Sequence, residues 1–136
     1  MSYSFNTEKT AAELVQWVKD YFKENASPET KAVIGISGGK DSSVAAAVCV
    51  KALGKDRVIG VLMPQGEQAD IDCSRLLVDT LGIQNYTINI GETVSSFMGE
   101  LKKHIETTNQ AIINTPARTR IPTLYAVADC AGGRVV

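Results

Sequence analysis

A short loop of glycine, serine and aspartate residues is the strongest chemical signal in the sequence. It follows the apolar run at residues 32–36 and reads Ser37, Gly38, Gly39, Lys40, Asp41, Ser42. Two glycines let the backbone turn sharply and approach a ligand closely. Backbone N–H groups at the start of the next helix face that ligand, with the positive end of the helix dipole behind them. The pattern therefore predicts a site for a polyanion such as pyrophosphate, with serine hydroxyls as additional donors.

Asp41 sets this loop apart from other phosphate-binding loops. The string matches neither G-x-x-x-x-G-K-[ST] nor G-x-G-x-x-G. A carboxylate beside phosphates repels them unless a cation lies between, so Asp41 predicts a bound Mg²⁺. Residue type alone leaves an alternative open, in which Asp41 only caps the helix. Lys40 occupies the variable position of the string, and its residue type slightly favours a solvated surface lysine.

The whole string after a buried strand resembles the pyrophosphate loop of the ATP pyrophosphatase superfamily, whose members cleave ATP to AMP and pyrophosphate while adenylating an acceptor. Two further stretches make the chain similar to the ammonia-dependent NAD synthetase family. They are residues 62–70, after the second strand, and residues 114–120, which are followed by Leu124 and Tyr125. The similarity covers nearly the whole chain from about residue 10. The stretch with two arginines is its most specific part.

The resemblance implies a ligase that forms a carbon–nitrogen bond by amidating deamido-NAD to NAD. In that reaction the nicotinate carboxylate attacks the α-phosphorus of ATP and pyrophosphate leaves. Ammonia then attacks the acyl carbon of the adenylated intermediate and releases AMP. The first step needs neutralised phosphates and a carboxylate placed in line. The resemblance also implies ATP as a substrate, Mg²⁺ as a cofactor and a homodimer, with the helix at 115–131 as the candidate contact surface.

Site residues carried over by the resemblance fall into two groups. The ATP group comprises Gly35, Ile36, Ser37, Gly38, Gly39, Lys40, Asp41, Ser42, Leu62, Met63 and Gln68, with Asp41 as the metal ligand. The deamido-NAD group comprises Asn114, Arg118, Arg120 and Tyr125. On a helix Arg118 and Arg120 lie about 200° apart, so they are not expected to bind one phosphate together. One of them is expected to face ligand, and the other a structural carboxylate or a partner subunit.

Several of these positions have a plainer interpretation or depart from the family pattern. Tyr125 suits core packing equally well, and Gln68 suits the polar start of a helix. Many relatives have arginine where this chain has Leu62, so a polar contact is lost there. Pro122 removes one backbone hydrogen bond and is expected to kink or delay the helix around it.

Alternating strands and helices predict a Rossmann-like α/β fold of the adenine nucleotide alpha hydrolase type, with helices on both faces of a parallel sheet. Strands are expected at 32–36, 58–63 and 85–90, and helices at 7–25, 41–53, 69–81, 94–107 and 115–131. Residues 134–136 resemble the first half of a fourth strand. We therefore expect one incomplete domain over residues 1–136, truncated in that strand, with little or no synthetase activity alone.

Composition narrows the choice of function. The net charge of −1 offers no bulk attraction for nucleic acid, and no apolar run approaches the roughly 20 residues that span a membrane. Three widely spaced cysteines without a signal peptide favour a cytoplasmic protein with reduced thiols. About thirty residues precede the first strand, too few for a glutaminase domain, which favours free ammonia as the nitrogen source.

The loop also fits two other functions. One is a different ATP pyrophosphatase, either a GMP synthetase or a tRNA-modifying sulfur-transfer enzyme. The stretch at 114–120 counts against the first, and the missing C-x-x-C motif counts against the second. The other is a non-catalytic module that binds adenine nucleotides, because such a module needs the same loop.

Overall fold

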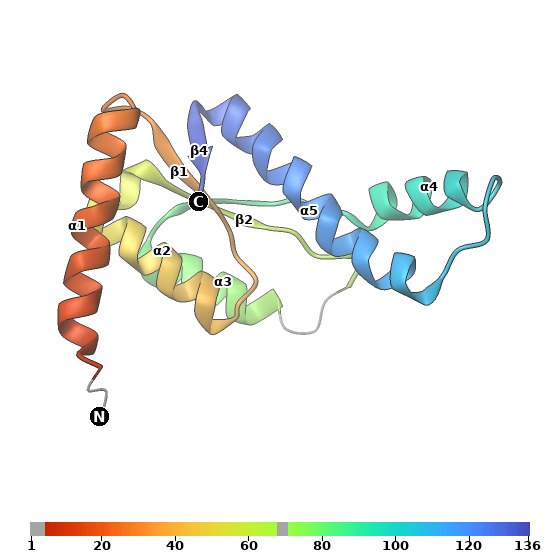
Figure 1. Ribbon diagram of the computed structural model, residues 1–136, viewed down its shortest axis with the longest axis horizontal. Coiled ribbons are helices and arrows are strands. Elements are labelled where there is room, and N and C mark those ends of the chain that lie inside the picture. Colours follow the sequence, from red (N-terminus) through yellow and green to blue (C-terminus); the bar gives the residue numbers. More distant parts are fainter. Residues whose placement is uncertain (1–4, 68–70) are drawn as a thin grey trace.

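A four-stranded parallel sheet lies at the centre of the structure (Figure 1), a computed structural model that describes residues 5–67 and 71–136. Its strands are β1 (Lys31–Gly35), β2 (Val58–Leu62), β3 (Gln84–Thr87) and β4 (Gly133–Val135). The helices are α1 (Thr7–Asn25), α2 (Lys40–Leu53), α3 (Ile71–Leu81), α4 (Gly91–Leu101) and α5 (Asn109–Ala131), with a short 3-10 turn, η1, at Lys55–Arg57.

The strand order is β3-β2-β1-β4. The chain moves outward from β1 through β2 to β3, and α5 then returns it to the other side of β1. Ala32 pairs with Val58 on one side of β1, and Lys31 pairs with Gly133 on the other. In sheets of this kind, ligands bind outside the carboxyl ends of the strands, where the order changes direction. The topology therefore predicts a ligand site at the loop that follows β1.

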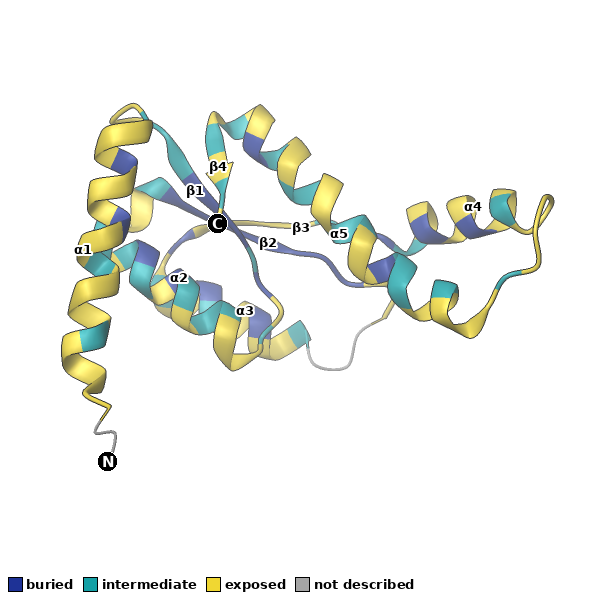
Figure 2. Cartoon of the chain, viewed as in Figure 1, coloured by how far each residue is buried: buried dark blue, intermediate teal, exposed yellow. Residues whose placement is uncertain are grey.

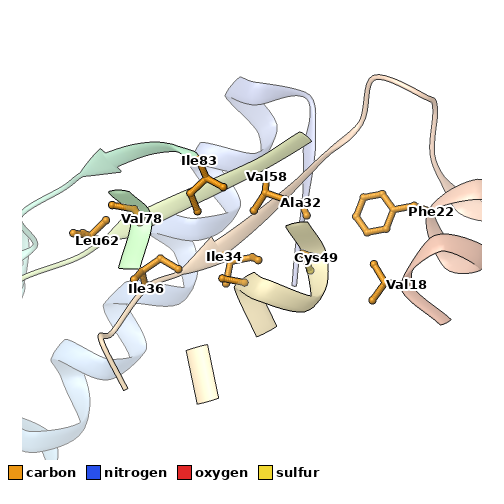
Figure 3. Packing of buried hydrophobic residues seen from close by; sticks show 11 residues of the cluster. Val18, Phe22, Ala32, Ile34, Ile36, Cys49, Val58, Leu62, Val78 and Ile83 are labelled. Carbon is orange, nitrogen blue, oxygen red and sulfur yellow. The ribbon is translucent and has the colours of Figure 1, made fainter. Parts of the chain in front are cut away.

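Both faces of the sheet are covered by helices, as the sequence predicted (Figure 2). Alternate residues of each central strand point to opposite faces, so Ile34 and Leu62 belong to one core while Val33 and Val61 belong to the other. The first core receives α1, α2 and α3, and Figure 3 shows its members Val18, Phe22, Ala32, Ile34, Ile36, Cys49, Val58, Leu62, Val78 and Ile83. The second core receives α4 and α5.

The longest helix, α5, begins six residues before the expected start at Thr115. The reason is Thr108, whose hydroxyl accepts a hydrogen bond from the backbone N–H of Ala111 at 3.2 Å and so caps the helix. The expectation that Pro122 delays the helix was wrong, because α5 runs continuously through it. Packing of α5 against β1 and β4 outweighs the lost hydrogen bond.

Other boundaries differ by a few residues. β3 ends at Thr87, but the N–H groups of Ile88 and Ile90 still donate to the carbonyls of Leu62 and Pro64, at 2.8 and 2.9 Å. The pairing therefore continues to the predicted end, without regular strand geometry. α4 spans 91–101 rather than 94–107. The predicted start of α3, at residue 69, lies outside the described residues.

The three cysteines are free, and their exposure differs. Cys49 is 1% exposed, and burial raises the pKa of its thiol. Because the thiolate is the reactive form, we expect DTNB to modify Cys73 and Cys130 in the folded protein and Cys49 only after unfolding. Equal reaction rates for all three thiols in the folded protein would contradict the buried position of Cys49.

Within the described part of the chain, none of the helices combines the length and the apolar character needed to cross a membrane.

Candidate functional site

A cavity of about 430 Å³ opens at the carboxyl ends of β1 and β2. This volume lies within the range of pockets that hold small ligands. Its walls come from the ends of both strands, from the first turn of α3 and from the middle of α5. The lining residues are Gly35, Ile36, Ser37, Leu62, Met63, Pro64, Ile71, Ser74, Arg120 and Leu124. The ends of β1 and β2 thus meet at one cavity.

The glycine loop begins at Ser37, which lines this cavity, and hydrogen bonds from its own serines stabilise it. Ser42 Oγ accepts a hydrogen bond from the Ser37 N–H at 3.3 Å and donates to the carbonyl of Gly39 at 3.1 Å. Ser37 Oγ lies 3.0 Å from Ser42 Oγ and accepts from the Gly39 N–H at 3.3 Å. Ser43 Oγ also donates to Gly39, at 2.8 Å. The serines therefore fix the shape of the loop before any ligand arrives.

The start of α2 leaves backbone donors open. Gly39 is the N-cap residue, and no side chain caps the helix. The N–H groups of Lys40, Asp41 and Ser42 have no acceptor among the described residues. Open N–H groups at a helix start, with the helix dipole behind them, bind anions such as phosphate. The loop is therefore chemically suited to hold a phosphate group.

Gly38 is required by both conformation and space. Its φ is +77°, a backbone conformation that residues with a side chain rarely adopt. A Cβ added there would lie 3.0 Å from Ser74 Oγ, 3.1 Å from Cys73 Cβ and 3.2 Å from the Ser74 nitrogen. The loop thus lies directly against the first turn of α3, and only glycine permits this approach.

Asp41 is exposed in the first turn of α2, beside the open N–H groups. The described residues contain no cluster of three or more acidic, cysteine or histidine side chains that holds a metal. A metal at this site would therefore take one carboxylate from the protein and its other ligands from phosphate and water. That donor set fits Mg²⁺, which commonly binds through one or two carboxylates and substrate phosphates.

The segment after β2 supplies an apolar wall. Leu62 is 1% exposed and its side chain packs in the first core, whereas Met63 belongs to the second. Gln68, which the resemblance assigned to ATP, lies outside the described residues.

Asn89 holds the turn at Gly66 in place. Its Oδ1 accepts hydrogen bonds from the N–H groups of Gly66 and Gly91, at 3.0 and 2.9 Å. Asn89 Nδ2 also donates to the Gly66 carbonyl at 3.1 Å.

The four residues assigned to deamido-NAD do not come together. Arg120 lines the cavity, and its Nε donates to the carbonyl of Met63 at 3.1 Å. Asn114 is half-buried, Arg118 is exposed and Tyr125 is 58% exposed, and none of the three lines the cavity. Helical geometry explains the difference, because Arg120 and Leu124 lie one turn apart on one face while Arg118 points elsewhere.

The model of the NAD synthase family matches residues 10–136. The chain belongs to that family.

Several relatives of the chain are NH(3)-dependent NAD(+) synthetases. The enzyme of Pyrococcus furiosus is 35% identical over 131 residues, which cover 96% of this chain and 48% of the relative. That of Methanosarcina mazei is 42% identical over 100 residues, covering 71% of this chain and 39% of the relative. The chain spans about half the length of the curated relatives it matches.

Solved structures agree with the fold. The NH3-dependent NAD synthetase of Campylobacter jejuni superimposes with a TM-score of 0.84 at 26% identity, covering 97% of this chain and 56% of that one. The NMN synthetase of Francisella tularensis gives 0.82 at 29% identity, covering 97% and 54%. The similarity confirms the predicted Rossmann-like α/β fold with its parallel sheet.

Within this NAD synthase fold, the contact from Arg120 to Met63 joins α5 to the end of β2. Replacing Arg120 by alanine is expected to lower the free energy of unfolding by about 1.5 kcal/mol, since a hydrogen bond from a charged donor is lost. Arg118→Ala is the matched control, because Arg118 is exposed and makes no hydrogen bond or ion pair with a described residue. Urea unfolding measures both, and equal effects would contradict a distinct role for Arg120.

Residue types alone missed four cavity residues, namely Pro64, Ile71, Ser74 and Leu124. A signal for two of them was present in the sequence. Ile71 and Ser74 are three residues apart at the start of the helix after the second strand, which is where parallel sheets place ligands. Leu124 was named only as a residue that follows the stretch at 114–120, and its approach to within 3.3 Å of a Cβ at Gly35 depends on the packing of α5.

Proposed function

We propose that the protein containing this chain amidates deamido-NAD to NAD with ammonia, using ATP and releasing AMP and pyrophosphate. The observation that carries the proposal is the group of open N–H donors at the start of α2, beside the cavity, in a member of the NAD synthase family. Those donors suit the pyrophosphate that leaves ATP. The names of the curated relatives support the rest of the reaction.

Each group of residues has a proposed task. The loop from Ser37 to Ser42 binds the β- and γ-phosphates of ATP and stabilises the charge that develops as pyrophosphate leaves. The apolar wall formed by Leu62 and Met63 holds adenosine. A carboxylate oxygen of deamido-NAD then bonds to the α-phosphorus as the bond to pyrophosphate breaks. In the second step ammonia bonds to the acyl carbon, the bond to AMP breaks, and the nitrogen loses a proton.

We propose Mg²⁺ as the metal, held by Asp41 together with phosphate oxygens. When bound, the ion neutralises charge on the phosphates and makes pyrophosphate a better leaving group. The position of Asp41 in the first turn of α2, beside donors that suit phosphate, supports this assignment.

The second substrate has a less complete site on this chain. Asn114, Arg118 and Tyr125 lie outside the cavity, on α5. We propose that they contact deamido-NAD together with a second copy of the protein. The exposed apolar side chains of Ile113 and Ile121, on the same helix, support a contact surface between two copies. Sedimentation equilibrium tests the homodimer, and a monomer at all concentrations would exclude it. The free thiols support a cytoplasmic location.

The reaction is tested by measuring AMP release from ATP and Mg²⁺ by protein expressed from its complete reading frame. Deamido-NAD, deamido-NMN and xanthosine monophosphate are offered separately as acceptors, with and without ammonium. The similarity to an NMN synthetase is the reason for the second acceptor. The proposal expects AMP with deamido-NAD, followed by NAD once ammonium is added. AMP only with deamido-NMN or xanthosine monophosphate would place the protein in another branch, and AMP with none of the three would favour a binding module.

A further inference from the structure

We infer that Ser74 contacts the phosphate chain of the bound nucleotide and so forms part of the phosphate site, from the α3 side. The inference rests on the proposed function, because it takes the ligand of the cavity to be ATP. Ser74 lies in the first turns of α3, across from the glycine loop, and lines the cavity.

The burial of Ser74 is the first observation. Ser74 is 2% exposed. Among the described residues it is a buried polar side chain, whereas the cores around it are apolar. Ser74 nevertheless lines the cavity, beside Ile71 of the same helix. A serine hydroxyl at a cavity wall can donate a hydrogen bond to a ligand oxygen.

The position of the hydroxyl identifies the part of the ligand that it meets. Ser74 Oγ lies 3.0 Å from the place of a Cβ on Gly38, the residue at the turn of the glycine loop. The other residue that α3 contributes to the cavity wall is Ile71, and the walls from β2 are Leu62, Met63 and Pro64. Those side chains suit an adenine ring. Ser74, which carries the hydroxyl on the described part of the α3 wall, therefore lies at the phosphate end of the cavity.

Two substitutions at Ser74 separate a hydrogen bond from packing. Ser74→Ala removes the hydroxyl. Ser74→Cys keeps a side chain of similar shape but replaces a strong donor by a weak one. If the hydroxyl binds phosphate, both variants bind ATP about tenfold more weakly, as expected for one hydrogen bond to a charged group. If Ser74 only fills space against Gly38, Ser74→Cys binds like the wild type.

Isothermal titration calorimetry with ATP and, separately, with adenosine is the decisive experiment. We expect both variants to lose affinity for ATP and to keep wild-type affinity for adenosine, which carries no phosphate. Thr80→Ala is the matched control, because Thr80 lies on the same helix and its hydroxyl donates to the Leu76 carbonyl at 2.7 Å, away from the cavity. Melting temperatures without nucleotide show that the variants fold.

The outcomes separate this inference from the proposed function. Unchanged ATP affinity in both variants, with a wild type that binds ATP, would overturn the role of Ser74 alone. An equal loss for ATP and adenosine would overturn the assignment to phosphate. A wild type that binds neither ATP nor adenosine would contradict the proposed function together with the inference that rests on it.

Discussion

Replacement of Gly38 by alanine is expected to lower AMP formation by about 100-fold or more, the effect seen when donors to a developing anion are displaced. The N–H groups that follow Gly38 form the proposed phosphate site, and their direction depends on the turn at this residue. A Cβ would approach Ser74 Oγ, Cys73 Cβ and the Ser74 nitrogen at 3.0, 3.1 and 3.2 Å. The last of these is a backbone atom of α3, so side-chain rotation does not relieve all of the contacts.

The same substitution is expected to lower the free energy of unfolding by about 2 kcal/mol, because φ is +77° at Gly38 and an alanine there is strained. Chemical denaturation measures this loss, and a coupled assay for AMP measures the activity. The two effects have different causes: strain lowers stability, whereas displacement of the loop lowers activity.

A second glycine separates strain from displacement. Gly132 has a φ of +63°, and a Cβ added there meets nothing within 4 Å. Gly132→Ala is therefore expected to lower stability by about 1 kcal/mol and to leave AMP formation unchanged. If both alanine variants lost activity to the same extent, the loss would come from instability, and the proposed role of the loop would be contradicted.

The sequence predicted the parts of the fold that depend on local pattern. The apolar run before the glycine loop forms β1, and α2 ends at Leu53 as expected, followed by Gly54 with a φ of +85°. The start of α5 depends on Thr108, a cap residue whose side-chain bond was not anticipated. Strand order also needed the structure, because the pairing of β1 with β4 joins Lys31 to Gly133, about a hundred positions apart.

The difference between local pattern and long-range packing also explains which parts of the site could be predicted. The glycine loop is contiguous in sequence, so its chemistry was readable from residue types alone. Arg120 and Ser74 reach the cavity from helices far apart along the chain, and their roles depend on packing. Arg120 illustrates the limit: the sequence indicated that the two arginines diverge, but not that Arg120 binds the Met63 carbonyl. Asn89 was missed for the same reason, since its partner Gly66 lies 23 residues away.

Asp41→Asn is expected to change ATP affinity in opposite directions with and without Mg²⁺. The substitution keeps the shape of the side chain and removes its charge. Without Mg²⁺, the variant is expected to bind ATP a few-fold more tightly than the wild type, because a carboxylate no longer repels the phosphates. With Mg²⁺, it is expected to bind more weakly and to form AMP about 100-fold more slowly, since the metal has lost its ligand from the protein.

A change in ATP affinity whose direction depends on Mg²⁺ distinguishes a metal ligand from a residue that only caps the helix. As a first-turn carboxylate Asp41 also interacts favourably with the dipole of α2, which accounts for about 0.5 kcal/mol of stability and does not depend on Mg²⁺. Glu8→Gln removes the equivalent charge from the first turn of α1 and is the matched control. Titrations of ATP with Mg²⁺ or with EDTA measure the effect. If Asp41→Asn and Glu8→Gln each lowered stability slightly and neither altered the response to Mg²⁺, Asp41 would act only on its helix, and the proposed metal site would be contradicted.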